Sequence, residues 1–335
     1  MIKITSDKDK VQLRSATFQS LRKADYEALK TWVRLLGAPP ARISKATLEK
    51  LSYDAAHNGE EDLLAYLLKY NKNVESVFRT LVAYGHIELL IKFQAKYTLQ
   101  LKDIFYDASF LIAVRNKHLS LVEYLYEQGC RAKNVVLRAV EFNAFEITEY
   151  LLEQGEEPSS SALVYASNFG LTNYIALLVK HGAVIDKEAV KGAAEFGQLD
   201  VLRYYVAQGF NLKDVGEYLI YYTAHNGHVH VLKYLKEQGL DLRADNDMAL
   251  VWAGDNIQID AIKYLVENGA DIRVKDDDLC VSAGCMGSLE LSKYLIEQAK
   301  DTETKRLLAA KIMLHTPKLN ALHELVVFLK GVSES

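Results

Sequence analysis

Three histidines and two cysteines come closest to a chemical site in this chain. His225, His228 and His230 lie within six residues, and His225 and His228 would share one face of a helix. Zinc sites are recognised by a fixed spacing of His, Cys and carboxylate ligands, and no acidic or thiol residue has such a spacing to these three. Cys280 and Cys285 are five residues apart, which is not the Cys-x-x-Cys spacing. We therefore predict structural histidines and buried free thiols rather than a metal site.

Motifs of the common enzyme classes are missing from the sequence. It contains no G-x-x-x-x-G-K-S phosphate loop, no G-x-S-x-G elbow and no set of kinase motifs. No separate segment of about a hundred residues, the usual size of a domain, is left over to hold a catalytic domain. We predict a protein that is not an enzyme and uses neither a cofactor nor a metal, although a Cys–His hydrolase stays open from the sequence alone.

Composition points to a folded, helical, intracellular protein. Half of the 335 residues are apolar, a quarter are charged and four are proline. No run of eighteen apolar residues occurs, and the charged segment from Met1 to Arg14 lacks the apolar core of a signal peptide. Three cysteines in a chain of this length fit a reducing compartment. We expect a soluble, cytoplasmic protein without membrane insertion.

The charge is unevenly distributed along the chain. Residues 1–50 carry 11 Lys and Arg against 5 Asp and Glu, and the remaining residues carry 29 against 39. A basic head can attract nucleic acid through its long-range field, but the favoured interpretation is the solvated face of a terminal helix. No basic stripe interleaved with aromatic residues follows it, so nucleic-acid binding is a minor alternative.

One pattern recurs along the whole chain, most clearly from Thr223 to Gly239. It consists of the end of a short helix, a turn at Gly227, and a second amphipathic helix that stops at Gly239. The equivalent turn residues, 26 to 32 residues apart, are Gly59, Gly85, Lys117, Asn143, Gly170, Gly197, Gly227, Ile257 and Gly287. The other predicted helix stops are Gly129, Gly155, Gly182, Gly209 and Gly269.

Fixed positions around each turn predict how the helices pack. Mostly small residues stand four positions before the turn, which allows two helices to approach closely. Apolar residues four and eight positions after it form a stripe with the frequent tyrosine at position seven, as in Tyr234 and Tyr264. We expect these tyrosines to pack against the repeat with their hydroxyls reaching water or a neighbouring helix. We expect the run Asp276-Asp277-Asp278 to be a solvated loop.

Each unit is thus a pair of short helices, too small to fold alone. The sequence predicts one repeat array over residues 1–335, with about 10 or 11 units. Nine clearer units cover residues 55–299, and an N-terminal cap unit (16–37) and a C-terminal cap unit (304–331) close the two ends.

These residues resemble the ankyrin-repeat family. The family's A-A-x-x-G-H and L-L-x-x-G-A-D segments are matched by A-A-H-N-G at Ala55–Gly59, T-A-H-N-G-H at Thr223–His228 and V-E-N-G-A-D-I at Val266–Ile272. The resemblance extends from Leu21 to Gly331. It implies an all-α, ankyrin-like solenoid whose first helices line the concave side.

The sequence also departs from the family. The T-P-L-H start of the first helix is missing from every unit, and most units have 26 to 30 residues instead of about 33. The β-hairpin fingers between units are therefore expected to be shortened or absent. Such short units resemble the ankyrin-like arrays of large DNA viruses, protozoa and intracellular bacteria.

With short fingers, partner contacts are expected at the two residues before each turn. Phe142, Phe169 and Phe196 occupy one position in three consecutive units, where they form either a stacked apolar anchor or part of the core between units. The candidate partner-binding residues are Glu141, Phe142, Asn168, Phe169, Glu195, Phe196, His225, Asn226, Asp255 and Asn256.

The predicted function is that of a non-catalytic scaffold that binds a protein partner through the concave face of the solenoid. The alternative is a host-directed effector or adaptor that recruits a target to a modifying or degradation machinery, in the host cytoplasm if the protein is viral or bacterial. Nucleic-acid binding through the basic N-terminal unit is a third possibility.

Overall fold

The computed structural model describes residues 45–68, 74–97, 103–316 and 323–334. Within these residues the regular secondary structure consists of twenty α-helices, α3 to α22, and one short 3-10 helix, with no strand. The predicted all-α fold is therefore confirmed. The predicted N-terminal cap unit (16–37) lies outside the described residues. Two compact units divide the chain, unit 1 at Met1–Tyr150 and unit 2 at Leu151–Ser335, and each is described by itself.

Unit 1 is built from helix pairs whose first helices pack against one another in order along the chain. The first helices are α3 (Lys45–His57), α5 (Val74–Ala83), α7 (Asp103–Arg115) and α9 (Val135–Glu141). The second helices are α4 (Glu61–Leu67), α6 (Ile87–Tyr97), α8 (Leu119–Glu127) and α10 (Phe145–Glu153), and the boundary between the two units falls within α10.

Unit 2 continues the same pairing. Its first helices are α11 (Ser160–Asn168), α13 (Lys187–Glu195), α15 (Tyr218–His225), α17 (Ala244–Asp255), α19 (Val274–Cys285) and α21 (Thr302–His315). Its second helices are α12 (Thr172–Lys180), α14 (Leu199–Ala207), α16 (Val229–Glu237), α18 (Ile259–Glu267), α20 (Leu289–Gln298) and α22 (His323–Glu334). The 3-10 helix η1 (Leu212–Asp214) precedes α15.

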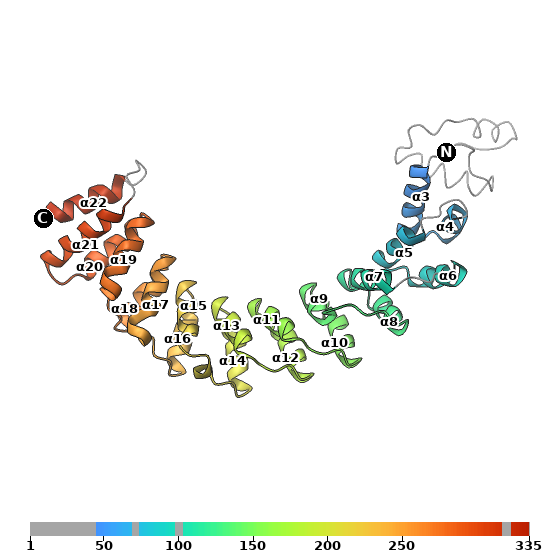
Figure 1. Ribbon diagram of the computed structural model, residues 1–335, viewed down its shortest axis with the longest axis horizontal. Coiled ribbons are helices and arrows are strands. Elements are labelled where there is room, and N and C mark those ends of the chain that lie inside the picture. The colour runs from blue at the N-terminus through green and yellow to red at the C-terminus, as the bar shows by residue number, and fades with distance from the viewer. Residues whose placement is uncertain (1–44, 69–73, 98–102, 317–322, 335) are drawn as a thin grey trace. The chain divides into compact units, whose positions relative to one another are not determined.

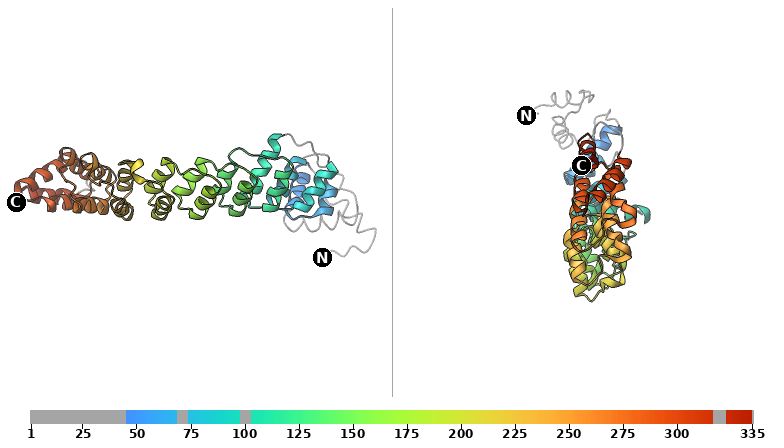
Figure 2. Two further views of the ribbon diagram at one scale, coloured as in Figure 1. Left: turned by 90° about the horizontal axis from the view of Figure 1, so that it is seen from below. Right: turned by 90° about the vertical axis from the view of Figure 1, so that its left-hand side faces the viewer.

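Within unit 2 the first helices lie along one edge and the second helices along the other (Figure 1). Figure 2 shows the same succession of pairs from two further directions. Each first helix from α11 to α19 packs against the next first helix, ending at α21. This packing fixes two sides, which we call the first-helix side and the second-helix side of unit 2. The loops between the helix pairs of unit 2 are all described and contain no strand, so no β-hairpin joins these pairs.

The predicted turns and helix stops are confirmed by the backbone. All nine predicted turn residues have φ between 52° and 80°, and the six glycines predicted to stop helices have φ between 79° and 98°. Glycine enters this left-handed region without a steric cost, which explains its recurrence. Lys117, Asn143 and Ile257 adopt the same turn without being glycine. Ile257 is the most strained of the three, because a β-branched residue rarely has a positive φ.

Close approach between first helices is the main feature of the core. The residues four positions before the turn, including Ala166, Ala193, Thr223 and Ala253, are fully buried. Gly284 shows how little space is left, because a Cβ atom added to it would lie 2.5 Å from the backbone carbonyl oxygen of Ile312 in α21. Small residues therefore set the distance between neighbouring units.

We predict that Gly284→Ala destabilises the protein by about 1–3 kcal/mol, because the added methyl group overpacks a contact with a backbone atom that cannot rotate away. Gly331→Ala is the matched control. No atom lies within 4 Å of a Cβ added at Gly331 in α22, so this change should stabilise its helix by about 0.5–1 kcal/mol. Urea unfolding followed by circular dichroism compares the two, and an equal effect of both changes would contradict the close approach.

Candidate partner-binding site

The predicted site residues stand where the first helices end. Asn168, Glu195, His225 and Asp255 are the last residues of α11, α13, α15 and α17. The residues that follow them cap these helices and are Phe169, Phe196, Asn226 and Asn256. The structure therefore brings these eight residues to equivalent positions in successive pairs of unit 2. Glu141 and Phe142 hold the same positions at the end of α9 in unit 1.

Phe169 and Phe196 are exposed. Their relative exposures are 58% and 50%, so the interpretation of these two rings as core is wrong. The predicted ladder between them is not formed either: the ring contact recorded for Phe169 is with Tyr165 of its own helix, at 4.6 Å between centroids. Phe142 is half-buried. Two separate apolar side chains, rather than one stack, are therefore presented by unit 2.

Hydrogen bonds between units hold the ends of the first helices in place. The Gln198 side-chain amide donates to the carbonyl oxygen of Asn168 at 3.0 Å, and the Nε2 atom of His228 lies 2.9 Å from that of Glu195. Gln198 and His228 each stand just after the turn of one helix pair, and each packs on the turn glycine of the preceding pair, Gly170 or Gly197. A Cβ atom at Gly197 would lie 2.7 Å from Nδ1 of His228. Glycine here thus serves both the turn and this packing.

His225 joins α15 to α17 through both ring nitrogens. Its Nδ1 lies 3.2 Å from the carbonyl oxygen of Trp252, and the amide of Asn256 lies 3.0 Å from its Nε2. This arrangement assigns the proton to Nδ1, because Nε2 must accept from the amide nitrogen. The same amide donates to the carbonyl oxygen of His225 at 3.1 Å. The Asn226 amide instead donates within its own helix, to Tyr222 at 3.0 Å.

The three histidines have separate partners. His225 contacts Trp252, His228 contacts Glu195, and Nε2 of His230 lies 2.9 Å from the carbonyl oxygen of Gly197. Among the described residues no group of three or more His, Cys, Asp or Glu side chains is arranged to hold a metal ion. The histidines therefore connect helices.

The cysteines differ from one another. Cys280 is buried in α19, and burial raises the pKa of its thiol to about 12. Cys130 is also buried, and its pKa is raised by burial to about 12. Cys285 is exposed at the end of α19, so the prediction that it is a buried thiol is wrong. Its position is the last residue of a first helix, which faces the same side as Asp255 in the preceding pair.

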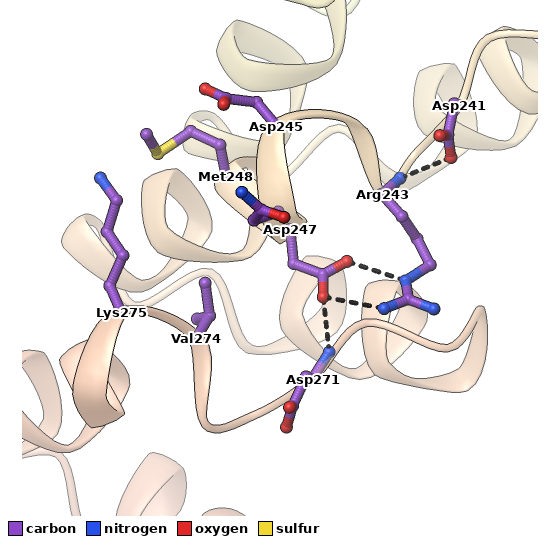
Figure 3. Close-up of a pocket in the computed structure, with 9 residues that line it drawn as sticks. Asp241, Arg243, Asp245, Asp247, Met248, Asp271, Val274 and Lys275 are labelled. Carbon is purple, nitrogen blue, oxygen red and sulfur yellow. Dashed lines mark hydrogen bonds and ion pairs between the residues drawn. The ribbon is translucent and has the colours of Figure 1, made fainter.

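An arginine–aspartate clamp is repeated at the start of two first helices, α17 and α19. Both oxygens of the buried Asp247 carboxylate accept from Arg243, at 2.9 Å and 3.2 Å, and one also accepts from the backbone N–H of Asp271 at 3.0 Å (Figure 3). Burial acts to raise the pKa of Asp247, but the hydrogen bonds from Arg243 and Asp271 outweigh it and hold the pKa below its usual value. The clamp thereby links α17 to the following unit.

The second clamp corrects the prediction for Asp276-Asp277-Asp278. Asp277 is buried and pairs with Arg273 and with Lys311, so this run is not a solvated loop throughout. Residues 275–277 have positive φ values, which turns the chain so that Asp277 points inward. A pocket of about 610 Å³ lies beside the first clamp and is lined by Asp241, Asp245, Asp271, Met248 and Lys275, among others (Figure 3).

A ladder of cation–π contacts runs along the second helices of unit 2. The cations lie 5.7–5.9 Å from ring centroids in the next unit, in the pairs Arg203–Tyr234, Lys233–Tyr264, Lys263–Tyr294 and Lys293–Phe328. Packing of these tyrosines was predicted, but the cations were missed. A signal existed in the sequence, because Lys-Tyr or Arg-Tyr recurs every 30 residues at 203, 233, 263 and 293.

Trp252 and its neighbours were also missed. The indole of Trp252 stacks on Tyr221 with 5.8 Å between ring centroids, and it packs edge-on against Tyr222 with 5.4 Å between centroids. His225 lies 5.8 Å from it. Trp252 stands three residues before Asp255, so helical spacing places it on the same face as the predicted site. The available signal was an aromatic residue at the same position of the preceding repeat, Tyr222.

Stacked helix pairs with exposed ends on one side define a helical-repeat protein. The family model described as ankyrin repeats (3 copies) matches residues 110–189 and again residues 190–276. The chain is therefore an ankyrin-repeat protein. Proteins of this family are in general protein–protein interaction scaffolds, and they are typically non-catalytic. The closer resemblance to viral, protozoan or bacterial arrays stays a prediction.

Among solved structures, the crystal structure of the human ASB11 ankyrin repeat domain matches part of the chain. That crystal structure has a TM-score of 0.43 and 17% sequence identity, and the match covers 52% of this chain and 96% of that chain. A search of curated proteins found no match. No helix among the described residues is long and apolar enough to cross a membrane.

We predict that His228 makes the stability of unit 2 depend on pH. Burial lowers the pKa of His228 from its usual 6.5, and the neighbouring His230 lowers it further, against the hydrogen bond to Glu195, which raises it. Because the unfolded chain then binds the proton more readily, this contribution to stability is present above about pH 6.5. It is lost as the pH falls through the folded-state pKa.

His228→Gln tests this dependence, because the preceding helix pair already has a glutamine, Gln198, at the position equivalent to His228. Urea unfolding between pH 7.5 and 5 should show a smaller loss of stability for this variant than for the unchanged chain. His228→Ala, which removes the bond to Glu195, should be less stable at pH 7.5 as well, by about 1 kcal/mol. An unchanged pH dependence in His228→Gln would contradict the prediction.

Proposed function

We propose that this protein binds a protein partner through the first-helix side of unit 2, at the ends of α11, α13, α15 and α17. The observation that carries the proposal is the exposure of Phe169 and Phe196 at equivalent positions of neighbouring pairs. Large apolar side chains beside polar ones, here Asn168 and Glu195, have the composition of an interface centre with its rim.

Pre-organisation supports the same proposal. The carbonyl groups of Asn168 and Glu195 are held by Gln198 and His228, so the chain that carries each phenylalanine is fixed before a partner arrives. A surface that is already ordered loses little conformational entropy on association, and the contacts of a few side chains then suffice for useful affinity. Family membership supports a protein as the partner.

We predict that Phe169→Ala and Phe196→Ala each leave the circular dichroism spectrum and melting temperature nearly unchanged, since both rings are exposed. Each change should weaken partner binding by about 1–2 kcal/mol, the cost of truncating an anchoring side chain. Affinity capture from lysate with mass spectrometry identifies the partner, and calorimetry with the purified partner measures the change.

Val327→Ala is the matched control, because Val327 is also about half exposed but lies in the second helix α22. It should leave binding unchanged. Equal weakening by Val327→Ala, or no weakening by either phenylalanine variant, would contradict the proposed surface.

A further inference from the structure

The two sides of unit 2 differ in charge. The five first helices from α11 to α19 contain eight Asp and Glu residues against three Lys, whereas the five second helices from α12 to α20 contain six acidic and six basic residues. The clamps neutralise Asp247 and Asp277, and Lys191 pairs with Glu188, yet an acidic excess persists on the first helices. A basic partner segment complements such a surface.

Acidic residues stand on the faces of α17 and α19 that carry Trp252 and its equivalent. Residues two, five and nine positions before the turn share one face of each first helix, since they are three and four residues apart. In α17 these are Asp255, Trp252 and Met248, and in α19 they include Ser282 and Asp278. No ion pair is recorded for Asp255 or for Asp278 among the described side chains.

The indole of Trp252 has aromatic neighbours from one helix only, within the described part of the chain. Tyr221, Tyr222 and His225 all belong to α15. On α19 the residue equivalent to Trp252 is the small Ser282. Trp252 is half-buried, so part of the residue is open to solvent. A flat cation fits a site that combines a ring face with carboxylates.

We propose that this surface, which we call the Trp252 face, takes an arginine side chain from a basic segment of the protein partner. The guanidinium stacks on the indole of Trp252, and the carboxylates of Asp255 and Asp278 balance its positive charge. Arginine suits the site better than lysine, because the guanidinium is planar, stacks on aromatic rings and pairs with carboxylates through two parallel hydrogen bonds. This inference rests on the proposed function and specifies the partner's chemistry.

The surface around Trp252 continues into the pocket beside the first clamp. Met248, one helical turn before Trp252, lines that pocket together with Asp241, Asp245 and Asp271 (Figure 3). Arg243 and Lys275 line the pocket as well, so its charge is mixed and we assign no second basic side chain to it.

Trp252 itself provides the measurement. The chain contains two tryptophans, so Trp32→Phe leaves Trp252 as the only indole. The full chain with this change is titrated with a peptide of alternating arginine and glycine, and with matched peptides that carry lysine or glutamate in place of arginine. We expect the arginine peptide to change the Trp252 fluorescence and to bind about tenfold more tightly than the lysine peptide. The glutamate peptide should not bind.

Paired charge variants separate the Trp252 face from a general acidic field. Asp255→Asn should weaken arginine-peptide binding about three- to fivefold, whereas Asp260→Asn, an exposed acid at the start of the second helix α18, should leave it unchanged. Trp252→Ala, followed by calorimetry, should weaken binding about tenfold. Trp252 packs on Tyr221 and Tyr222 of α15, so the melting temperature of Trp252→Ala is measured as well. If that melting temperature falls, the binding of Asp255→Asn is the deciding result.

Three results would overturn the inference. The first is equal affinity for the arginine and lysine peptides, and the second is an equal effect of Asp255→Asn and Asp260→Asn on binding. The third is that a peptide copying residues 1–44 binds more tightly than the arginine peptide, which would assign the surface to the basic head of this chain. If none of the basic peptides binds while Phe169→Ala still weakens capture of the partner, the inference fails and the proposed scaffold function stands. If Phe169→Ala and Phe196→Ala leave capture intact, the proposed function fails independently.

Discussion

A hydrogen bond between neighbouring helix pairs is the interaction on which the rest of the structure depends. In unit 1 and in unit 2, a histidine or glutamine just after one turn forms a hydrogen bond with the carbonyl oxygen at the end of the preceding first helix. The examples are His86 with His57, His118 with Ala83, Gln198 with Asn168, and His228 with Glu195. Because a single helix pair buries too little surface to fold alone, such links between pairs decide whether the array forms.

The same bond connects stability to function. The carbonyl that it holds belongs to the residue two positions before the turn, and the side chains of this residue and the next one form the proposed site. The link behind each helix end is therefore also what positions Phe169, Phe196 and their polar neighbours. On the opposite side the cation–π ladder ties the second helices together. Both sides of unit 2 thus connect neighbouring helix pairs, and the first-helix side also presents the exposed Phe169 and Phe196.

Much of this architecture is readable from the sequence. The period places the turn correctly even at Lys117, Asn143 and Ile257, where glycine is missing, because the surrounding apolar positions keep their register. The exposure of Phe169 is not readable in the same way, since an aromatic residue at a helix end can turn toward solvent or toward the next unit. Its side chain direction depends on the backbone of the following turn.

Contacts between units explain the other differences. Asp277 belongs to a run of three acids that resembles a solvated loop, but Arg273, Lys311 and three residues of positive φ turn it inward. The surroundings of Trp252 come from Tyr221, Tyr222 and His225, some 30 residues earlier in the chain. A linear pattern assigns each residue to a position, but the neighbours of that position are set by the stacking of the units.

Hydrogen–deuterium exchange of the full chain, with and without its affinity-purified partner, tests most directly whether the first-helix side is a pre-organised binding surface. Pre-organisation predicts that the partner slows exchange at the ends of α11, α13, α15 and α17, and that these segments are already protected in the free protein. Slowed exchange confined to the second helices α12, α14 and α16 would contradict the proposed surface. Unprotected ends of the first helices in the free protein would contradict its pre-organisation.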